Sequence, residues 1–178
     1  MNPLSLEPVP FAESYWVIPG KFLAGEHPAL WGQASTTKRI QALLRSGITV
    51  FVDLTEPLHA ERLYKELLIQ EAAEYGLEVS YRSFPIRDFT APSAETVKQI
   101  LDVLDQSLSS GKGVYVHCTA GIGRTGTIVG CFLARHGTTG RAALDRLNML
   151  RSGMPSWYRR SPEDPDQVDL VLSWQEGS

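Results

Sequence analysis

Hydrophobic and polar positions follow two alternating patterns along the chain, one typical of strands and the other of helices. Short β-branched or aromatic runs predict strands at 15–18, 21–24, 48–54, 79–84 and 113–117. Apolar residues at helical spacing predict helices over 35–46, 60–75, 93–108, 124–136, 140–151 and 165–174. The almost continuously apolar run 48–54 is typical of a strand buried on both faces of a sheet.

The alternation of strands with helices predicts an α/β fold, a single domain with a central, mostly parallel sheet flanked by helices. Ser93 is a suitable N-cap for the third helix, and Asp164 with Pro165 opens the last one. Three prolines in the first fourteen residues favour an extended N-terminal arm over 1–14, so the domain is expected to comprise 15–178.

Composition and charge narrow the class of protein. A chain of 178 residues with a net charge of −3 suits one soluble globular domain, and the mildly acidic balance argues against a general nucleic-acid binder. No segment has the roughly 20 apolar residues of a membrane span, and the N-terminus lacks the features of a signal peptide. We therefore expect a cytoplasmic protein that does not bind a membrane and is a monomer.

The segment His117-Cys118-Thr-Ala-Gly-Ile-Gly-Arg124-Thr-Gly lies between a predicted strand and a predicted helix. A glycine-containing loop before a helix directs backbone N–H groups into one concavity, where the helix dipole adds positive charge, so a phosphate is the expected ligand. Arg124 can bind two phosphate oxygens, and the same field favours the thiolate of Cys118. A lone buried cysteine is usually only a small apolar residue. The combination of residues and context favours a catalytic role.

These residues resemble the His-Cys-x5-Arg-Ser/Thr signature of the cysteine-dependent protein tyrosine and dual-specificity phosphatases, in their compact form. The resemblance implies that Cys118 is the nucleophile and Arg124 the phosphate clamp. It also implies a cradle of backbone amides from Thr119, Ala120, Gly121, Ile122, Gly123 and Arg124. His117 would orient the loop, or be an ordinary core histidine. Thr125 would hydrogen-bond the sulfur, or be an ordinary first-turn residue.

A general acid must come from elsewhere, and family members place an aspartate about thirty residues before the cysteine. Asp88 lies at this spacing and is followed by Pro92, as in the acid loop of the family. Ile86-Arg87 stands where tyrosine-specific enzymes have Trp-Pro. Asp53, at the end of a buried strand, is the competing candidate for the acid or a structural residue. Gln167 resembles the water-positioning glutamine of the family, and an exposed helix position is the alternative.

The remaining candidates are interpreted structurally. Cys131 is expected in the core, and His27, His59 and His136 at the surface or at helix caps, because their spacing suggests no metal site. The arginine-rich stretch 135–160 is read as a solvated helix face, with a docking surface for phosphorylated or acidic substrate as the alternative.

We therefore expect a protein phosphatase that needs no metal or other cofactor and acts on a phosphorylated protein. Two alternatives remain. One is a phosphatase of phosphoinositide, nucleotide or RNA 5′-phosphate, and the other is an inactive relative that only binds phosphoproteins. The uncharged loop side chains argue against the first, and the intact Cys118, Arg124 and Asp88 argue against the second.

Overall fold

A computed structural model describes residues 8–178 except 31, 58 and 176, without the side chains of residues 59–63. Its strands are β1 (Ser14–Ile18), β2 (Phe22–Gly25), β3 (Ile48–Asp53), β4 (Ser80–Ser83) and β5 (Gly113–His117). Its helices are α1 (Gln33–Arg45), α2 (His59–Glu74), α3 (Ala94–Ser109), α4 (Gly123–Arg135), α5 (Arg141–Leu150) and α6 (Pro165–Ser173). Each boundary lies within two residues of the predicted one.

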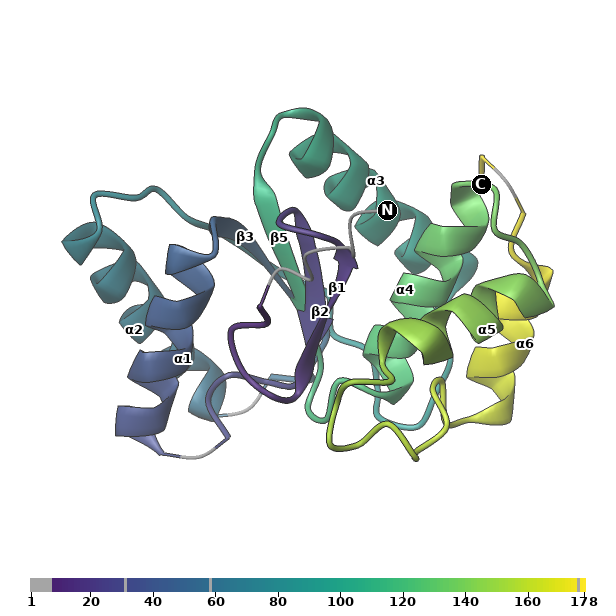
Figure 1. Cartoon of the computed structure of the whole chain (residues 1–178), viewed down its shortest axis with the longest axis horizontal. Coiled ribbons are helices and arrows are strands. Elements are labelled where there is room, and N and C mark those ends of the chain that lie inside the picture. The colour runs from purple at the N-terminus through teal and green to yellow at the C-terminus, as the bar shows by residue number, and fades with distance from the viewer. Residues whose placement is uncertain (1–7, 31, 58, 176) are drawn as a thin grey trace, which may run out of the picture.

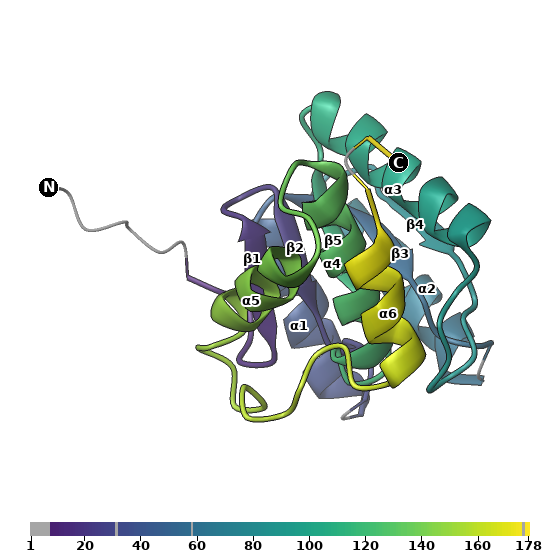
Figure 2. The same ribbon diagram turned by 90° about the vertical axis from the view of Figure 1, so that its right-hand side faces the viewer.

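The strands form one sheet in the order β1-β2-β5-β3-β4. β1 pairs antiparallel with β2, and the other neighbours are parallel, which confirms the mostly parallel sheet. In Figure 1 the helices α1 and α2 lie on one side of the sheet, and α3 to α6 lie on the other. Figure 2 faces the layer formed by α3 to α6 and shows α5 and α6 packed over α4.

The sheet has a hydrophobic core on each face because successive strand residues point to opposite sides. Phe51 and Tyr115 belong to the core beneath α1 and α2, whereas Val52 and Val116 belong to the core beneath α3 to α6. Cys118 belongs to the second core. The loops at the ends of the strands are therefore held by packed layers on both sides.

The predicted N-terminal arm is described only in part. Residues 1–7 lie outside the described residues, and Ser14 is the first residue of β1 rather than the end of the arm. The ring of Phe11 lies edge-on against Tyr115, with 6.0 Å between ring centroids. This part of the predicted arm therefore packs against the domain.

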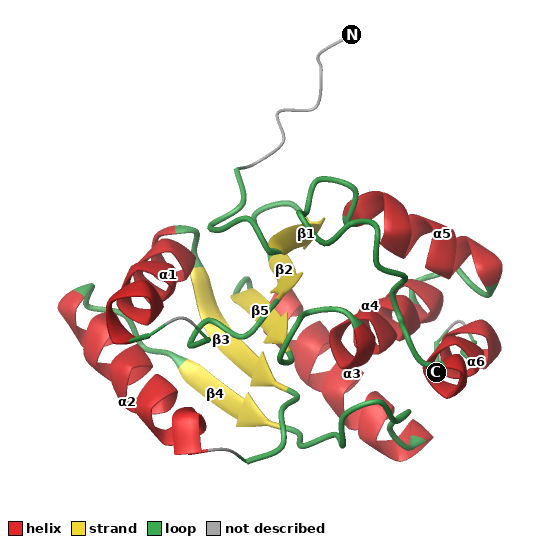
Figure 3. Cartoon of the chain, turned by 90° about the horizontal axis from the view of Figure 1, so that it is seen from below, coloured by secondary structure: helices red, strands yellow, loops and turns green. Residues whose placement is uncertain are grey.

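The three central strands end at one edge of the sheet. His117 at the end of β5 is the register partner of Gly25 on β2 and of Asp53 on β3. Figure 3 shows the parallel arrows of β3 and β4 pointing toward the loops at this edge. Ligand sites in such sheets lie outside the carboxyl ends of parallel strands, so this edge is where a site is expected. No helix in the described part of the chain is long and apolar enough to cross a membrane.

Candidate active site

The loop between β5 and α4 carries the predicted nucleophile. Cys118 is buried, with 2% of its surface exposed, and the loop reaches α4 at Gly123. Gly121 has a φ of +70°, and a Cβ atom there would lie 2.4 Å from the carbonyl carbon of Gly25. The backbone N–H of His27 donates to the carbonyl oxygen of Thr119 at 3.0 Å. The segment after β2 thus supports the loop from behind.

Arg124 lies in the first turn of α4, and its guanidinium group is fixed by three oxygen atoms. Nη1 donates to the carbonyl oxygen of Ile86 at 3.1 Å, and Nη2 donates to Oγ1 of Thr119 at 3.0 Å. Nη2 also lies 3.0 Å from Oδ1 of Asp88. Nε is buried and has no hydrogen-bond partner in the described structure. A phosphate oxygen is a suitable acceptor for this remaining N–H group.

Asp88 comes from the loop that follows β4, and the fold brings it to the signature loop. Its side chain is 54% exposed, and its carboxylate contacts Arg124. The backbone N–H of Asp88 donates to Oε2 of Glu56 at 3.2 Å. The sequence analysis assigned Asp88 and Arg124 to one site. The structure brings the two side chains into contact although they lie 36 positions apart in the sequence. An exposed carboxyl group at this position can exchange protons with solvent and with a bound substrate.

Thr125 follows Arg124 and is fully buried. Its hydroxyl group has no hydrogen-bond partner among the described residues. A buried hydroxyl without a partner costs free energy, so it is available to a group that enters or changes during a reaction.

Gln167 lies in the first turn of α6 and is completely buried, so the exposed alternative is wrong. Its Nε2 atom donates to the carbonyl oxygen of Thr90 at 3.0 Å, and its Oε1 accepts from the N–H of Asp164 at 3.4 Å in a capping box. A Cβ atom on Gly123 would lie 3.0 Å from Oε1. Gln167 therefore links α6 to the loop of Asp88 beside the start of α4.

Ser161 is a supporting residue that the sequence interpretation missed. It is buried, and its hydroxyl donates to the carbonyl oxygen of Ile122 at 2.7 Å. A Cβ atom on Gly126 would lie 2.1 Å from the same hydroxyl oxygen. The segment before α6 therefore fastens the end of the loop, and no local sequence signal marks this contact.

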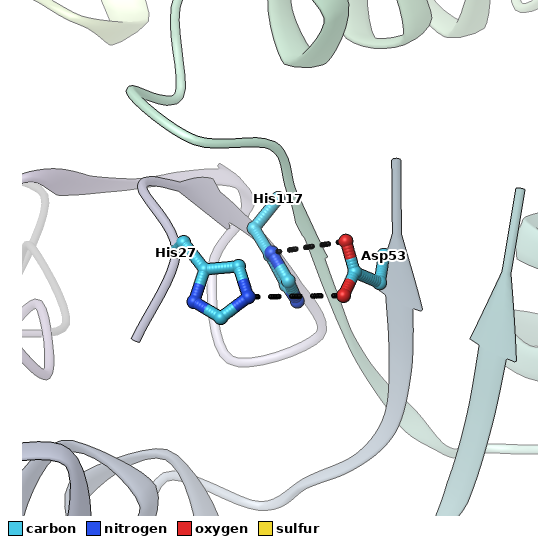
Figure 4. A group of neighbouring side chains, drawn as sticks. All are labelled: His27, Asp53 and His117. Atoms are coloured by element: carbon cyan, nitrogen blue, oxygen red, sulfur yellow. Dashed lines mark ion pairs between the residues drawn. The ribbon is translucent and has the colours of Figure 1, made fainter. Parts of the chain in front are cut away.

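Behind the loop, three buried side chains from the ends of β2, β5 and β3 meet. Nε2 of His27 and Nδ1 of His117 each lie 3.8 Å from a different carboxylate oxygen of Asp53 (Figure 4). The prediction that His27 lies at the surface or at a helix cap is wrong, because only 6% of its surface is exposed. The parallel order β2-β5-β3 brings the three residues together, and their separation in the sequence hides this arrangement.

Asp53 is held as a carboxylate. Burial raises its pKa, but His117 and hydrogen bonds from Tyr81 and Thr55 outweigh burial and leave the pKa below the usual value. Oδ1 accepts from both the N–H and the hydroxyl of Thr55, at 2.8 and 2.7 Å, and Oδ2 accepts from the Tyr81 hydroxyl at 2.6 Å. A buried, ionised carboxylate of this kind is a poor proton donor.

The two histidines are held neutral by burial. The pKa of His27 is lowered to about 4, mainly by burial, and the pKa of His117 is also lowered by burial although Asp53 opposes the shift. Nδ1 of His27 accepts from the backbone N–H of Ala29 at 3.1 Å. Because a neutral imidazole has one N–H group, the proton of His27 lies on Nε2 and faces Asp53.

This cluster does not fit a metal ion, although its ligand atoms all lie within 4.8 Å of one another. Two imidazoles and a carboxylate are a zinc-type donor set, but tetrahedral bonds of about 2.0–2.1 Å would require ligand atoms roughly 3.4 Å apart. Binding through Nε2 of His27 also requires a lone pair, which this nitrogen lacks while Nδ1 accepts from Ala29.

Acidification from pH 6.5 toward pH 4 is expected to destabilise the protein through His27. Its pKa falls from 6.5 to about 4 on folding, so between these values the unfolded chain binds a proton that the folded chain does not. The free energy of unfolding therefore decreases as the pH decreases, and His27 contributes up to about 3 kcal/mol to this loss. Urea unfolding of the wild type and His27→Phe at several pH values across this window measures the effect. Parallel pH dependences in the two proteins would contradict it.

The remaining sequence interpretations concern Cys131, two histidines and the arginine-rich stretch 135–160. Cys131 is buried as expected, and burial raises the pKa of its thiol to about 12. His136 is the C-cap of α4, whereas the side chain of His59 lies outside the described residues. The solvated-face reading of 135–160 is wrong for Arg151, which is fully buried and donates to the carbonyl oxygen of Arg159 at 2.9 Å.

The chain resembles known phosphatases in both sequence and fold. A family model described as "Polymorphic toxin system, DSP-PTPase phosphatase" matches residues 26–138, more than half of the chain. The crystal structure of Tk-PTP in the active form has a TM-score of 0.63 with this chain at 25% sequence identity, covering 89% of this chain and 93% of that one. The structural match confirms the predicted fold class.

Two curated relatives have different substrate descriptions. Dual specificity protein phosphatase CDC14B of Mus musculus is 29% identical over 174 residues, 91% of this chain and 32% of the relative. Phosphatidylglycerophosphate phosphatase PTPMT2 of Arabidopsis thaliana is 29% identical over 124 residues, 68% of this chain and 51% of the relative. The chain thus spans about a third to a half of the length of these relatives.

Proposed function

The chain belongs to the DSP-PTPase phosphatase family of polymorphic toxin systems, and on this basis we propose that it is a protein phosphatase that hydrolyses phosphotyrosine, with phosphoserine and phosphothreonine as further substrates. The reaction proceeds through a phosphocysteine intermediate on Cys118. The contact of 3.0 Å between Arg124 and Asp88 is the observation that carries the proposal, because it places a phosphate-binding cation beside an exposed carboxyl group.

In the first step, the thiolate of Cys118 attacks phosphorus, an S–P bond forms and the P–O bond to the leaving group breaks. Arg124 and the amides of the loop bind the other phosphate oxygens, where negative charge is concentrated in the transition state. Protonated Asp88 gives its proton to the departing oxygen. The unpartnered Nε of Arg124 supports the phosphate-binding role of this residue, because the guanidinium group keeps an N–H donor for the phosphoryl group.

In the second step, water attacks phosphorus, the S–P bond breaks and phosphate leaves. Asp88, now a carboxylate, takes the proton of the water, and Gln167 orients the water from its position beside Gly123. The hydroxyl of Thr125 stabilises the sulfur as it leaves with the bonding electron pair. Its buried, unpartnered state in the described structure supports this assignment.

The side chains around the loop favour an aromatic phosphate ester over a strongly anionic lipid or nucleotide headgroup. Thr119, Ala120 and Ile122 contribute no charge to the loop. Phe89, directly after Asp88, has 62% of its surface exposed and offers an apolar ring at the acid loop. The likeness to PTPMT2 makes a phosphorylated glycerolipid the second candidate substrate.

A panel of substrates tests the proposal, each measured with and without EDTA. The panel comprises a phosphotyrosine peptide, a phosphothreonine peptide, vesicles containing phosphatidylglycerophosphate, and a 5′-phosphorylated RNA. We expect kcat/KM to be highest for the phosphotyrosine peptide by at least about tenfold over the lipid and the RNA, or roughly 1.4 kcal/mol of transition-state binding. A higher value for the lipid vesicles would replace the proposal with the second candidate. Loss of activity with EDTA would contradict the mechanism.

A further inference from the structure

We propose that Asp53 and His27 are positioning residues that act through His117: together they hold its ring in one tautomer and one orientation, and this sets the geometry of Cys118 for the reaction. The inference rests on the proposed function, because it assigns Cys118 the role of nucleophile. It adds two residues from other strands, neither of which belongs to the signature loop.

Asp53 provides the fixed point of the arrangement. Its carboxylate accepts three hydrogen bonds from Thr55 and Tyr81, which hold both oxygen atoms in place. Each oxygen still faces one imidazole nitrogen at 3.8 Å. These separations are too long for hydrogen bonds, but a buried negative charge still attracts the positive end of an N–H group and repels a nitrogen lone pair. The carboxylate therefore selects an N–H group at both nitrogens that face it.

His27 completes the orientation of the carboxylate. Since its Nδ1 accepts from Ala29, its proton lies on Nε2, which faces Oδ2 of Asp53 at 3.8 Å. Its ring meets the ring of His117 almost perpendicularly, at 82° and 4.8 Å between centroids. The same residue also holds Thr119 through its backbone N–H, so a change of the side chain leaves that contact with the catalytic loop in place.

The plane of His117 is fixed by packing, whereas its tautomer is not. Tyr115 stacks on the ring at 5.4 Å and Tyr64 meets its edge at 5.5 Å, so the ring is enclosed by other rings. Neither ring nitrogen has a hydrogen-bond partner within the described part of the chain. Packing opposes rotation of the ring, and Asp53, which faces Nδ1, favours the tautomer that carries the proton on this nitrogen. His117 ends β5 and directly precedes Cys118, so the position of its ring is coupled through the shared backbone to the geometry of the nucleophile.

A double-mutant cycle on p-nitrophenyl phosphate tests the proposal. Asp53→Asn keeps the shape of the side chain but offers His117 an amide instead of a carboxylate. We expect it to lower kcat by about 10- to 100-fold, as large as the loss when the outer-shell partner of a metal-ligating histidine is replaced. KM should stay within about twofold, because the contacts of Arg124 are unchanged. In a His117→Gln background, Asp53→Asn should lower kcat by less than about threefold, since its effect passes through His117.

Two variants at position 27 give an independent test. His27→Gln keeps an N–H donor near the position of Nε2, and should retain most of the wild-type kcat. His27→Phe keeps the ring without a donor, and should lose about tenfold in kcat, as for an outer-shell partner. Tyr64→Phe is the matched control, because it removes a buried hydroxyl that has no partner in the described structure while keeping the ring beside both histidines. It should behave like the wild type.

Each variant is checked by thermal unfolding and by alkylation of Cys118 with iodoacetate, and kcat is expressed per alkylated site. An equal loss from Asp53→Asn in both backgrounds, or equal rates for His27→Gln and His27→Phe, would overturn the proposal. If His117→Gln does not fold, the position 27 pair decides alone. A wild type that does not hydrolyse p-nitrophenyl phosphate would instead contradict the proposed function, so the two failures are distinguishable.

Discussion

Replacing Cys118 with serine is expected to lower kcat by at least about 10⁴-fold, because a hydroxyl group is not ionised at neutral pH and cannot replace the thiolate as the nucleophile. Binding of a phosphotyrosine peptide should remain within about threefold of the wild type, since Arg124 and the amides of the loop are retained. Steady-state hydrolysis of p-nitrophenyl phosphate in the presence of EDTA, with calorimetric titration of the phosphotyrosine peptide, measures both quantities.

Cys131→Ser is the matched control for this experiment. Cys131 is equally buried, but burial raises the pKa of its thiol to about 12, and its helix position puts it in the core. The control should therefore retain wild-type kcat. Full activity in Cys118→Ser, or inactivity of Cys131→Ser with a folded chain, would show that the nucleophile has been assigned to the wrong residue.

Replacing Asp88 with asparagine is expected to lower kcat by roughly 10²–10⁴ on a phenyl phosphate with a poor leaving group, the usual contribution of general acid catalysis. The loss should shrink as the leaving group becomes less basic, because such a phenolate leaves without a proton. A plot of log kcat against leaving-group basicity should be nearly flat for the wild type and steep for the variant. The contact with Arg124 is kept through the amide oxygen of the new side chain, so KM should change little.

Asp102→Asn serves as the comparison for Asp88→Asn. Asp102 is another exposed aspartate that pairs with an arginine, Arg135, but on α3 away from the signature loop. It should show no dependence on the leaving group beyond that of the wild type. If Asp88→Asn keeps the wild-type rate on strongly basic leaving groups, another residue is the acid. The ionised and hydrogen-bonded state of Asp53 makes that residue a poor replacement.

The parts of the site that depend on neighbouring residues were predictable. The pattern from His117 to Thr125 is contiguous, and its position between a strand and a helix follows from local periodicity. Asp88 was found from the spacing to the cysteine that the family resemblance implies, and this interval holds one helix, one strand and their loops. The helix and strand boundaries could also be predicted from neighbouring residues, because caps and turn glycines mark them.

The supporting residues were not predictable, because they meet through strand order and helix docking. His27 reaches His117 only because β2 lies beside β5, and no periodicity within either segment shows that pairing. Gln167 is buried because α6 docks against α4, and its short amphipathic pattern is compatible with an exposed position. Arg151 was read as solvated for the same reason, since a buried arginine satisfied by loop carbonyl groups has no signature in the sequence.

The close approach of Gly121 to Gly25 limits which substitutions the molecule can accept. A side chain at 121 would strike backbone atoms of residues 25 and 26, and the positive φ adds strain. Because every amino acid carries those backbone atoms, no second substitution on the facing segment can relieve the collision. A saturation library at Gly121 should therefore return only glycine among active clones, and no suppressor mutation at 25 or 26 should rescue a larger residue. We therefore expect position 121 to stay glycine during adaptation of the enzyme to any substrate.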